Sequence, residues 1–239
     1  MFRKVSQLRG ENAFLPGWAG LAFNPAYLMR RSLVAAIGEV VGGVGGVLLD
    51  FGCGSRPYES LFRVERYMGL DIEVSGHPQA GKRADIYYDG ETIPLDDASV
   101  DHVFSAEVFE HVFNAPELFR EIRRVLKPGG SFIMTCPFVW PLHEQPYDFA
   151  RYTPYALNAM LGDAGFSAIQ VRRHGHPIEA VCQLALAYCM EHLVPPVRVL
   201  SGLAGLVYCL TFNLAGRVGA RFLPNKGTLY LGNIAVALK

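Results

Sequence analysis

The alternation of short apolar runs with amphipathic segments is the feature that most constrains the fold of this chain. Apolar runs bounded by glycine or turn residues predict strands at 46–52, 66–72, 84–89, 100–106, 131–137, 166–173 and 229–238. Segments with helical spacing precede the first strand, at 24–41, and lie between later strands, around 107–112, from 114 to 126 and from Thr153 to about Gly162. Such alternation predicts an α/β fold with a mostly parallel sheet of about seven strands, helices on both faces and an antiparallel last strand.

The domain organisation follows from length and from one apolar stretch near the end. A chain of 239 residues is long enough for one domain with an insertion. We therefore expect a single domain over 1–239, with a core at 24–175, an apolar helical insertion at 176–228 and the last strand at 229–239.

Charge and cysteine content exclude several classes of function. Lysine plus arginine equals aspartate plus glutamate, 22 against 22, so nothing predicts a nucleic-acid partner. The five cysteines include no CxxC pair, which argues against a disulfide framework and a zinc site. Together with an N-terminus that lacks the apolar run of a signal peptide, this predicts a cytoplasmic protein.

A glycine-rich turn follows the first predicted strand, in "VLLDFGCGSRPY" at 47–58. A dinucleotide site needs the pattern G-x-G-x-x-G, but Pro57 occupies the third glycine position. Asp50, at the end of the strand, also suits an anionic pyrophosphate poorly. A carboxylate beside two glycines fits S-adenosylmethionine better, because that cofactor has no phosphate and carries a positive sulfonium and an ammonium group.

Four segments in order resemble one family, the class I S-adenosylmethionine-dependent methyltransferases of the type-11 domain kind. These are "LLDFGCG", "GLDI", "YYDGETIPLDDASVDHVFSAEVFEHV" and "VLKPGGSFIMTCP". The resemblance covers about 24–175 and the last strand, and implies a Rossmann-like sheet. It implies that Asp71 holds the ribose hydroxyls, that Asp89 contacts the adenine amino group and that the Gly90 N–H contacts a ring nitrogen. The cofactor-binding residues that it implies are Asp50, Gly52, Gly54, Asp71, Ile72, Asp89, Gly90 and Glu107.

Arg56 departs from the family pattern D-x-G-x-G-x-G. The turn must therefore close without a third glycine, and the Arg56 side chain either faces solvent or meets a carboxylate.

The segment after the fifth predicted strand, 137–157, places titratable groups among aromatic residues, as a partly desolvated pocket requires. One hypothesis makes His143 a general base assisted by Asp148, with Trp140, Arg151 and Tyr152 binding the substrate. The alternative is an ordered loop in which Asp148 and Arg151 form a structural pair. No paired spacing of metal ligands occurs, so no metal is expected, and Glu110-His111 is interpreted as helix packing and capping.

The apolar insertion predicts two helices broken at Pro195-Pro196. The uncharged run 199–216 has 18 residues, at the lower limit for a membrane span. A single crossing would separate the last strand from its sheet, so three interpretations stay open. The helices form a lid or a homodimer interface, they contact a membrane or lipid-linked substrate peripherally through 178–223, or they insert.

The sequence thus predicts an S-adenosylmethionine-dependent methyltransferase that methylates an oxygen of a small-molecule, sugar or lipid-linked acceptor. A second hypothesis is a non-catalytic S-adenosylmethionine-binding module that docks on a membrane or a partner. A nicotinamide-dependent oxidoreductase is the third.

Overall fold

The structure is a computed structural model that describes residues 13–72 and 81–239. The chain divides into two compact units. The helical unit comprises Met1–Ala36, Val139–Pro141 and His174–Gly232, and the sheet unit comprises Ile37–Phe138, Leu142–Arg173 and Asn233–Lys239.

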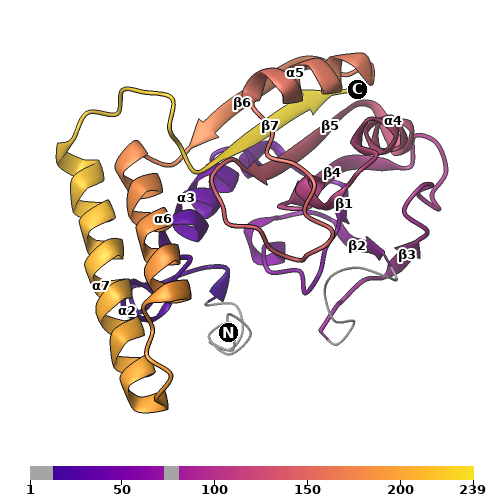
Figure 1. The fold of residues 1–239 in the computed structure, drawn as a ribbon. Coiled ribbons are helices and arrows are strands. Elements are labelled where there is room, and N and C mark those ends of the chain that lie inside the picture. Colours follow the sequence, from indigo (N-terminus) through magenta and orange to yellow (C-terminus); the bar gives the residue numbers. More distant parts are fainter. Residues whose placement is uncertain (1–12, 73–80) are drawn as a thin grey trace. The chain divides into compact units, whose positions relative to one another are not determined.

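A seven-stranded sheet in the order β3-β2-β1-β4-β5-β7-β6 is the main feature of the fold (Figure 1). Its strands are β1 (Val47–Phe51), β2 (Arg66–Ile72), β3 (Ile86–Tyr88), β4 (Val100–Ala106), β5 (Leu126–Pro137), β6 (Ser167–His174) and β7 (Gly232–Leu238). β1 pairs in parallel with β2 on one side and with β4 on the other. The strand order therefore reverses next to β1, which is where ligands bind in open α/β sheets.

The last strand runs antiparallel to its neighbours, as predicted. The backbone N–H of Lys239, just after β7, donates to the carbonyl of Gly130 near the start of β5. Leu231, just before β7, donates to His174 at the end of β6. Opposite ends of adjacent strands therefore meet, and the predicted fold class is confirmed.

Two helices, α4 (Ala115–Val125) and α5 (Pro154–Asp163), contribute to the core of the sheet unit. Thr153 caps α5, because its hydroxyl oxygen accepts a hydrogen bond from the Ala156 N–H. The side chain of Asn114, at the N-terminus of α4, makes no such bond. The largest buried side chains of this core include Phe51, Leu70, Phe109, Phe119, Ile122 and Phe132.

The segment after β4 differs from the helix that the sequence predicts. It forms only a 3-10 turn, η4 (Phe109–His111), which resembles the short turns η2 (Val41–Gly43) and η3 (Glu59–Leu61). The carbonyl of Glu110 accepts hydrogen bonds from the N–H groups of Phe149 and Ala150. The turn is thus bound to the loop after β5 and does not continue as a helix.

The helical unit contains α2 (Gly20–Phe23), most of α3 (Tyr27–Gly38), α6 (Pro177–His192) and α7 (Arg198–Phe222). α6 and α7 pack along each other, and the chain breaks between them around Pro195-Pro196, as expected. Two buried amides join these helices to the N-terminal segment. Gln183 donates to the Pro25 carbonyl, and Asn213 donates to the carbonyls of Leu21 and Asn24.

Candidate active site

Three carboxylates mark the carboxyl edge of the sheet beside the switch point. Asp50 lies in β1, Asp71 lies in β2, and Asp89 follows β3. The three strands are adjacent and parallel, so their carboxyl ends share one edge. All three belong to the predicted cofactor site, and the topology brings the carboxyl ends of their strands to that edge.

Asp50 is a buried carboxylate with a polar neighbour on β2. The Tyr67 hydroxyl donates a hydrogen bond of 2.7 Å to Asp50 Oδ2. Burial raises the pKa of Asp50 to about 7, although the bond from Tyr67 opposes the shift. A nearby cation would favour the charged form, so this position suits a positively charged ligand.

The glycine turn after β1 depends on Gly52 and Gly54. Gly52 has φ +73°, and a Cβ there would lie 2.5 Å from Val108 Cγ2, so no larger residue fits without movement. Gly54 has φ +49°, and a Cβ there would meet no atom within 4 Å. The backbone at Gly54 is therefore open to the close approach of a ligand.

Arg56 turns inward and meets a carboxylate. Its guanidinium donates to Asp85 Oδ2, and Asp85 also accepts a 2.9 Å bond from the Gly69 N–H. The Arg56 side chain is mostly buried and lies over the Tyr67 ring. Arg56 adopts φ +57°, which is rare for a residue with a side chain, so the ion pair holds the turn in a conformation that glycine usually supplies.

Asp71 is fully engaged within the sheet unit. Oδ2 accepts from the Gly54 N–H, and Oδ1 accepts from the Ile72 N–H and from Lys82 Nζ, each at 2.8 Å. Lys82 also donates to the Ile72 carbonyl. The sequence gives no sign of Lys82, whose ammonium lies beside the carboxylate predicted to hold the ribose hydroxyls.

Asp89 and Gly90 form an exposed turn after β3. Asp89 Oδ1 accepts from the N–H groups of Glu91 and Thr92, both at 2.8 Å, and these bonds lower the pKa of Asp89. Gly90 has φ +95°. The turn thus fixes an ionised carboxylate at the position that the resemblance assigns to the adenine amino group.

The chemistry of this edge fits S-adenosylmethionine. Carboxylates end or follow three adjacent strands, and the backbone at Gly54 is open. A cationic cofactor without phosphate matches that donor set, whereas a pyrophosphate would face repulsion from Asp50.

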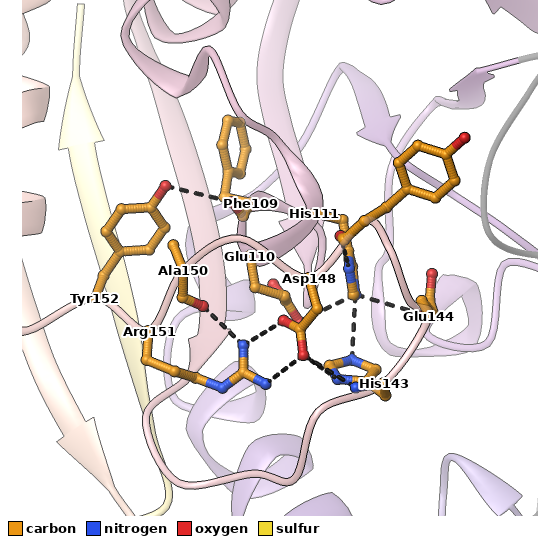
Figure 2. A network of polar contacts seen from close by, with 10 residues as sticks. Phe109, Glu110, His111, His143, Glu144, Asp148, Ala150, Arg151 and Tyr152 are labelled. Carbon is orange, nitrogen blue, oxygen red and sulfur yellow. Dashed lines mark hydrogen bonds and ion pairs between the residues drawn. The ribbon is translucent and has the colours of Figure 1, made fainter.

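A second polar cluster joins the turn after β4 to the loop after β5 (Figure 2). Glu107 follows β4 with φ +57°, and its backbone N–H donates to Thr135 in β5. Val108 lies against the Gly52 position, and the Phe109 ring stacks on Phe51 of β1 at 5.5 Å. These contacts place the start of the cluster next to the glycine turn.

Asp148 is the anchor of the loop after β5. Arg151 donates to both of its oxygens, at 2.5 and 2.8 Å, and the backbone N–H of His143 donates to Oδ2 at 3.0 Å. Although burial opposes ionisation, these bonds lower the pKa of Asp148 to about 2. The structural pair that the sequence offers as an alternative is therefore present.

Two imidazoles face each other beside this anchor. His143 Nε2 lies 3.1 Å from His111 Nε2, and His143 Nδ1 lies 3.3 Å from Asp148 Oδ2. Burial, followed by the neighbouring His111, lowers the pKa of His143. His143 and Asp148 therefore lie side by side, and their catalytic roles stay a prediction. His111 is an additional member, which the sequence analysis interprets as packing and capping.

Glu110 completes the cluster beside the imidazoles (Figure 2). Its side chain is fully buried, and neither carboxylate oxygen accepts a hydrogen bond from a described residue. Burial and then the charge of Glu107 raise the pKa of Glu110 well above its ordinary value. Glu110 and His111 lie in the turn that follows β4 at the carboxyl edge of the sheet, and this position is the signal that could have identified them as site residues.

The three predicted substrate-binding residues lie in different surroundings. Arg151 is bound to Asp148, and the Tyr152 hydroxyl lies 3.4 Å from the Phe109 carbonyl, to which it donates. Trp140 packs against the hydrophobic cluster of the helical unit that contains Tyr27 and Leu231. Their roles in binding a substrate stay predictions.

Comparison with known proteins identifies the sheet unit. The profile of the "Methyltransferase domain" family matches residues 49–134. An "uncharacterized methyltransferase" of Mycobacterium ulcerans is 32% identical over 186 residues, which cover 73% of this chain and 69% of that protein. A "probable S-adenosylmethionine-dependent methyltransferase" of Mycolicibacterium smegmatis is 30% identical over 60% of this chain and 66% of its own length.

Solved structures agree with the fold. Phosphoethanolamine N-methyltransferase 2 of Haemonchus contortus, determined with S-adenosylmethionine, superposes with a TM-score of 0.56 and 20% identity, covering 98% of this chain and 60% of that one. At this identity the likeness concerns the fold alone. The family profile, the mycobacterial relatives and the carboxylate edge lead to one conclusion: the chain belongs to the class I S-adenosylmethionine-dependent methyltransferases.

Proposed function

We propose that this methyltransferase methylates a hydroxyl oxygen, and that the acceptor loses its proton at the imidazole pair of His111 and His143. The observation that carries the proposal is the pair itself, with its Nε2 atoms 3.1 Å apart beside the carboxyl ends of β4 and β5. A hydroxyl is a weak nucleophile and needs a base, whereas an amine or a thiolate needs less help.

The chain's own residues supply orientation and proton removal. When bound, S-adenosylmethionine supplies an activated methyl group on a sulfonium sulfur. The acceptor oxygen forms a bond to the methyl carbon, the sulfur keeps the electron pair of the broken bond, and the hydroxyl proton passes to an imidazole Nε2. Asp148 acts as a positioning residue, because it contacts His143 Nδ1 and is itself held by Arg151.

The test of this proposal is the position of the transferred methyl group. Wild-type protein with labelled S-adenosylmethionine and a panel of sugar, small-molecule and lipid-linked alcohols is expected to give an O-methyl product by mass spectrometry. His143→Ala and His111→Ala are expected to lower kcat by about 10²- to 10⁴-fold, the usual contribution of general-base catalysis. Calorimetry should show unchanged binding of S-adenosylhomocysteine in both variants, which proves that they are folded. Methylation of nitrogen or sulfur, or an undiminished kcat in the double variant, would contradict the proposal.

Among the acceptor classes, the helical unit favours one that is lipid-linked. By length and composition, α7 is the one described helix that could cross a membrane, with a mean hydropathy of 1.6 over a window that is only 17% buried. Its exposed apolar residues follow helical spacing on one face: Leu200, Leu203, Val207, Leu210 and Leu214. Such a face suits the surface of a bilayer.

The end of α7 adds features of an interfacial helix. A groove in the helical unit is lined by Trp18, Arg31, Arg217, Arg221 and Phe222, among others. Trp18 and Phe222 are strongly exposed. Aromatic rings and arginines together are typical of the membrane–water interface and of contact with anionic headgroups. We therefore propose peripheral docking on the cytoplasmic membrane surface.

A flotation experiment tests this docking. The protein is expected to float with vesicles of mixed zwitterionic and anionic phospholipid, and the triple variant Leu203→Gln/Val207→Gln/Leu210→Gln is expected to stay at the bottom, because it removes the apolar face. Tyr155→Gln, which changes an exposed aromatic residue on α5, is the matched control and should float. If the wild type stays at the bottom and light scattering shows a dimer that the triple variant loses, the face is a homodimer interface instead.

A further inference from the structure

We propose that Glu110, His111 and His143 form a binding site for a divalent transition-metal ion such as zinc. Their ligand atoms all lie within 4.8 Å of one another. The inference rests on the O-methylation of the proposed function, and the ion would take the place of the imidazole base at the same cluster. Three observations support the site: the orientation of the two imidazoles, the buried carboxylate and the carboxylates around the rings.

The neighbours of the two rings favour one tautomer in each. His111 Nδ1 lies 2.7 Å from the Tyr147 carbonyl, which can only accept, so Nδ1 carries the proton. His143 Nδ1 makes no hydrogen bond but lies 3.3 Å from Asp148 Oδ2, and this carboxylate favours a proton on Nδ1. With these tautomers both rings present an unprotonated Nε2, and the two lone pairs face each other across 3.1 Å. Two lone pairs repel at this distance unless a proton or a metal ion lies between them.

The distance of 3.1 Å between the two Nε2 atoms suits a shared metal ion. Zinc binds imidazole nitrogen at about 2.0–2.1 Å, so two ligands at the tetrahedral angle are about 3.3 Å apart. The contacts to Nδ1 are those that usually hold metal-binding histidines, a backbone carbonyl for one ring and a carboxylate for the other. The rings also meet at a steep interplanar angle of 76°, so both can direct Nε2 to one point.

Glu110 supplies the third ligand. Its fully buried carboxylate, which no described residue hydrogen-bonds, has Oε1 3.8 Å from His111 Nε2. A buried carboxylate without hydrogen bonds is costly, and a metal ion would satisfy it. On the other side, Glu144 Oε1 lies 3.4 Å from the same nitrogen. Two imidazoles and one carboxylate form the ligand set of many catalytic zinc sites, which keep a fourth position open.

Carboxylates surround the two imidazoles. Glu110 Oε1 and Glu144 Oε1 lie 3.8 and 3.4 Å from His111 Nε2, and Asp148 forms a bidentate pair with Arg151. A divalent ion among them would favour the ionised form of the buried Glu110, which is the form that binds a metal. With the ion bound, the two Nε2 atoms would be ligands and could no longer accept the proton. An acceptor hydroxyl in the open position would then lose its proton to water, because the metal would lower the pKa of that hydroxyl.

Metal binding to the full chain tests the site directly. After dialysis against a chelator, the wild type is expected to bind one equivalent of Zn²⁺ or Co²⁺ in a competition titration, and the Co²⁺ form should show the visible spectrum of a tetrahedral site. His111→Ala, His143→Ala and Glu110→Gln are each expected to weaken binding at least about 100-fold. Asp148→Asn should weaken it by about 10- to 100-fold, as loss of an outer-shell partner does. His192→Gln, a change at an exposed histidine on α6, should bind as the wild type does.

Two results would overturn the site: no stoichiometric binding by the wild type, or unchanged binding by the His111→Ala/His143→Ala double variant. A rise in melting temperature with Zn²⁺ in the wild type, absent in the double variant, supports it even if that variant is less stable. O-methylation at full rate by chelator-treated protein would refute the metal's role and leave the proposed function standing. Methylation of a nitrogen atom would instead contradict the proposed function, whereas stoichiometric metal binding would still support the metal site.

Discussion

Gly52→Ala is expected to lower the free energy of unfolding by about 2–5 kcal/mol and to weaken S-adenosylmethionine binding more than about tenfold. About 1–2 kcal/mol comes from placing a side chain at φ +73°, and about 1–3 kcal/mol comes from overpacking. The new Cβ would lie 2.5 and 2.8 Å from the two methyl carbons of Val108. Since Val108 connects the glycine turn to η4, the displacement reaches both parts of the active site. Urea unfolding and calorimetry with the cofactor measure the two effects.

Two further variants separate steric clash from backbone strain. Val108→Ala removes both clashing methyl groups, so the double variant Gly52→Ala/Val108→Ala should regain part of the lost stability relative to Val108→Ala alone. Gly54→Ala has a positive φ but no neighbour within 4 Å, so it should cost only about 1–2 kcal/mol in stability. If the urea midpoint of Gly52→Ala equals that of the wild type, the close approach of Val108 to position 52 does not limit the stability of the fold.

The sequence predicts those parts of the fold whose cause is local. The strands at 66–72 and 100–106 have the predicted bounds because apolar residues and flanking turns determine them. Thr153 caps α5 within three residues of its partner. The helix predicted around 107–112 is wrong, because the Glu110 carbonyl finds its partners in the loop after β5. β5 begins at Leu126 and not at 131, because Leu126 pairs with Val100.

In the active site, too, the sequence predicts the features that have a local cause and misses those that depend on distant residues. The order of the motifs identifies the cofactor edge, since Asp50, Asp71 and Asp89 follow from strand ends. The direction of Arg56 depends on Asp85, 29 residues away, and the imidazole pair joins residues 32 apart. Separations of this length along the chain do not follow the periodicity of a helix or a strand, so the sequence pattern does not predict these contacts. A pair of histidines from two loops becomes visible only once the sheet has placed the carboxyl ends of β4 and β5 side by side.

Asp50→Asn is expected to weaken binding of S-adenosylmethionine by about 10- to 150-fold at pH 8, because a hydrogen bond or charge contact to an ionised group contributes about 1.5–3 kcal/mol. Asparagine keeps the shape of the side chain and can still accept a hydrogen bond from the Tyr67 hydroxyl, so the fold should be retained.

Binding of S-adenosylmethionine by the wild type should also depend on pH. A cationic ligand needs ionised Asp50, and the pKa of Asp50 in the free protein is about 7. Affinity should therefore be constant above pH 8 and fall as the pH drops below 7, approaching tenfold per unit, because protonated Asp50 must first lose its proton.

A second substitution reveals which group titrates. The bond from Tyr67 lowers the pKa of Asp50, so Tyr67→Phe should raise it and move the fall in affinity to higher pH. Asp50→Asn should remove the pH dependence, and methylthioadenosine, which lacks the cationic end of the cofactor, should bind independently of pH in this range. A wild-type affinity that is flat between pH 5.5 and 8, or a Tyr67→Phe profile shifted to lower pH, would show that Asp50 does not face the charged end of the cofactor. The expected shift follows from geometry alone: one hydroxyl, 2.7 Å from a buried carboxylate, stabilises the anion that the cofactor must meet.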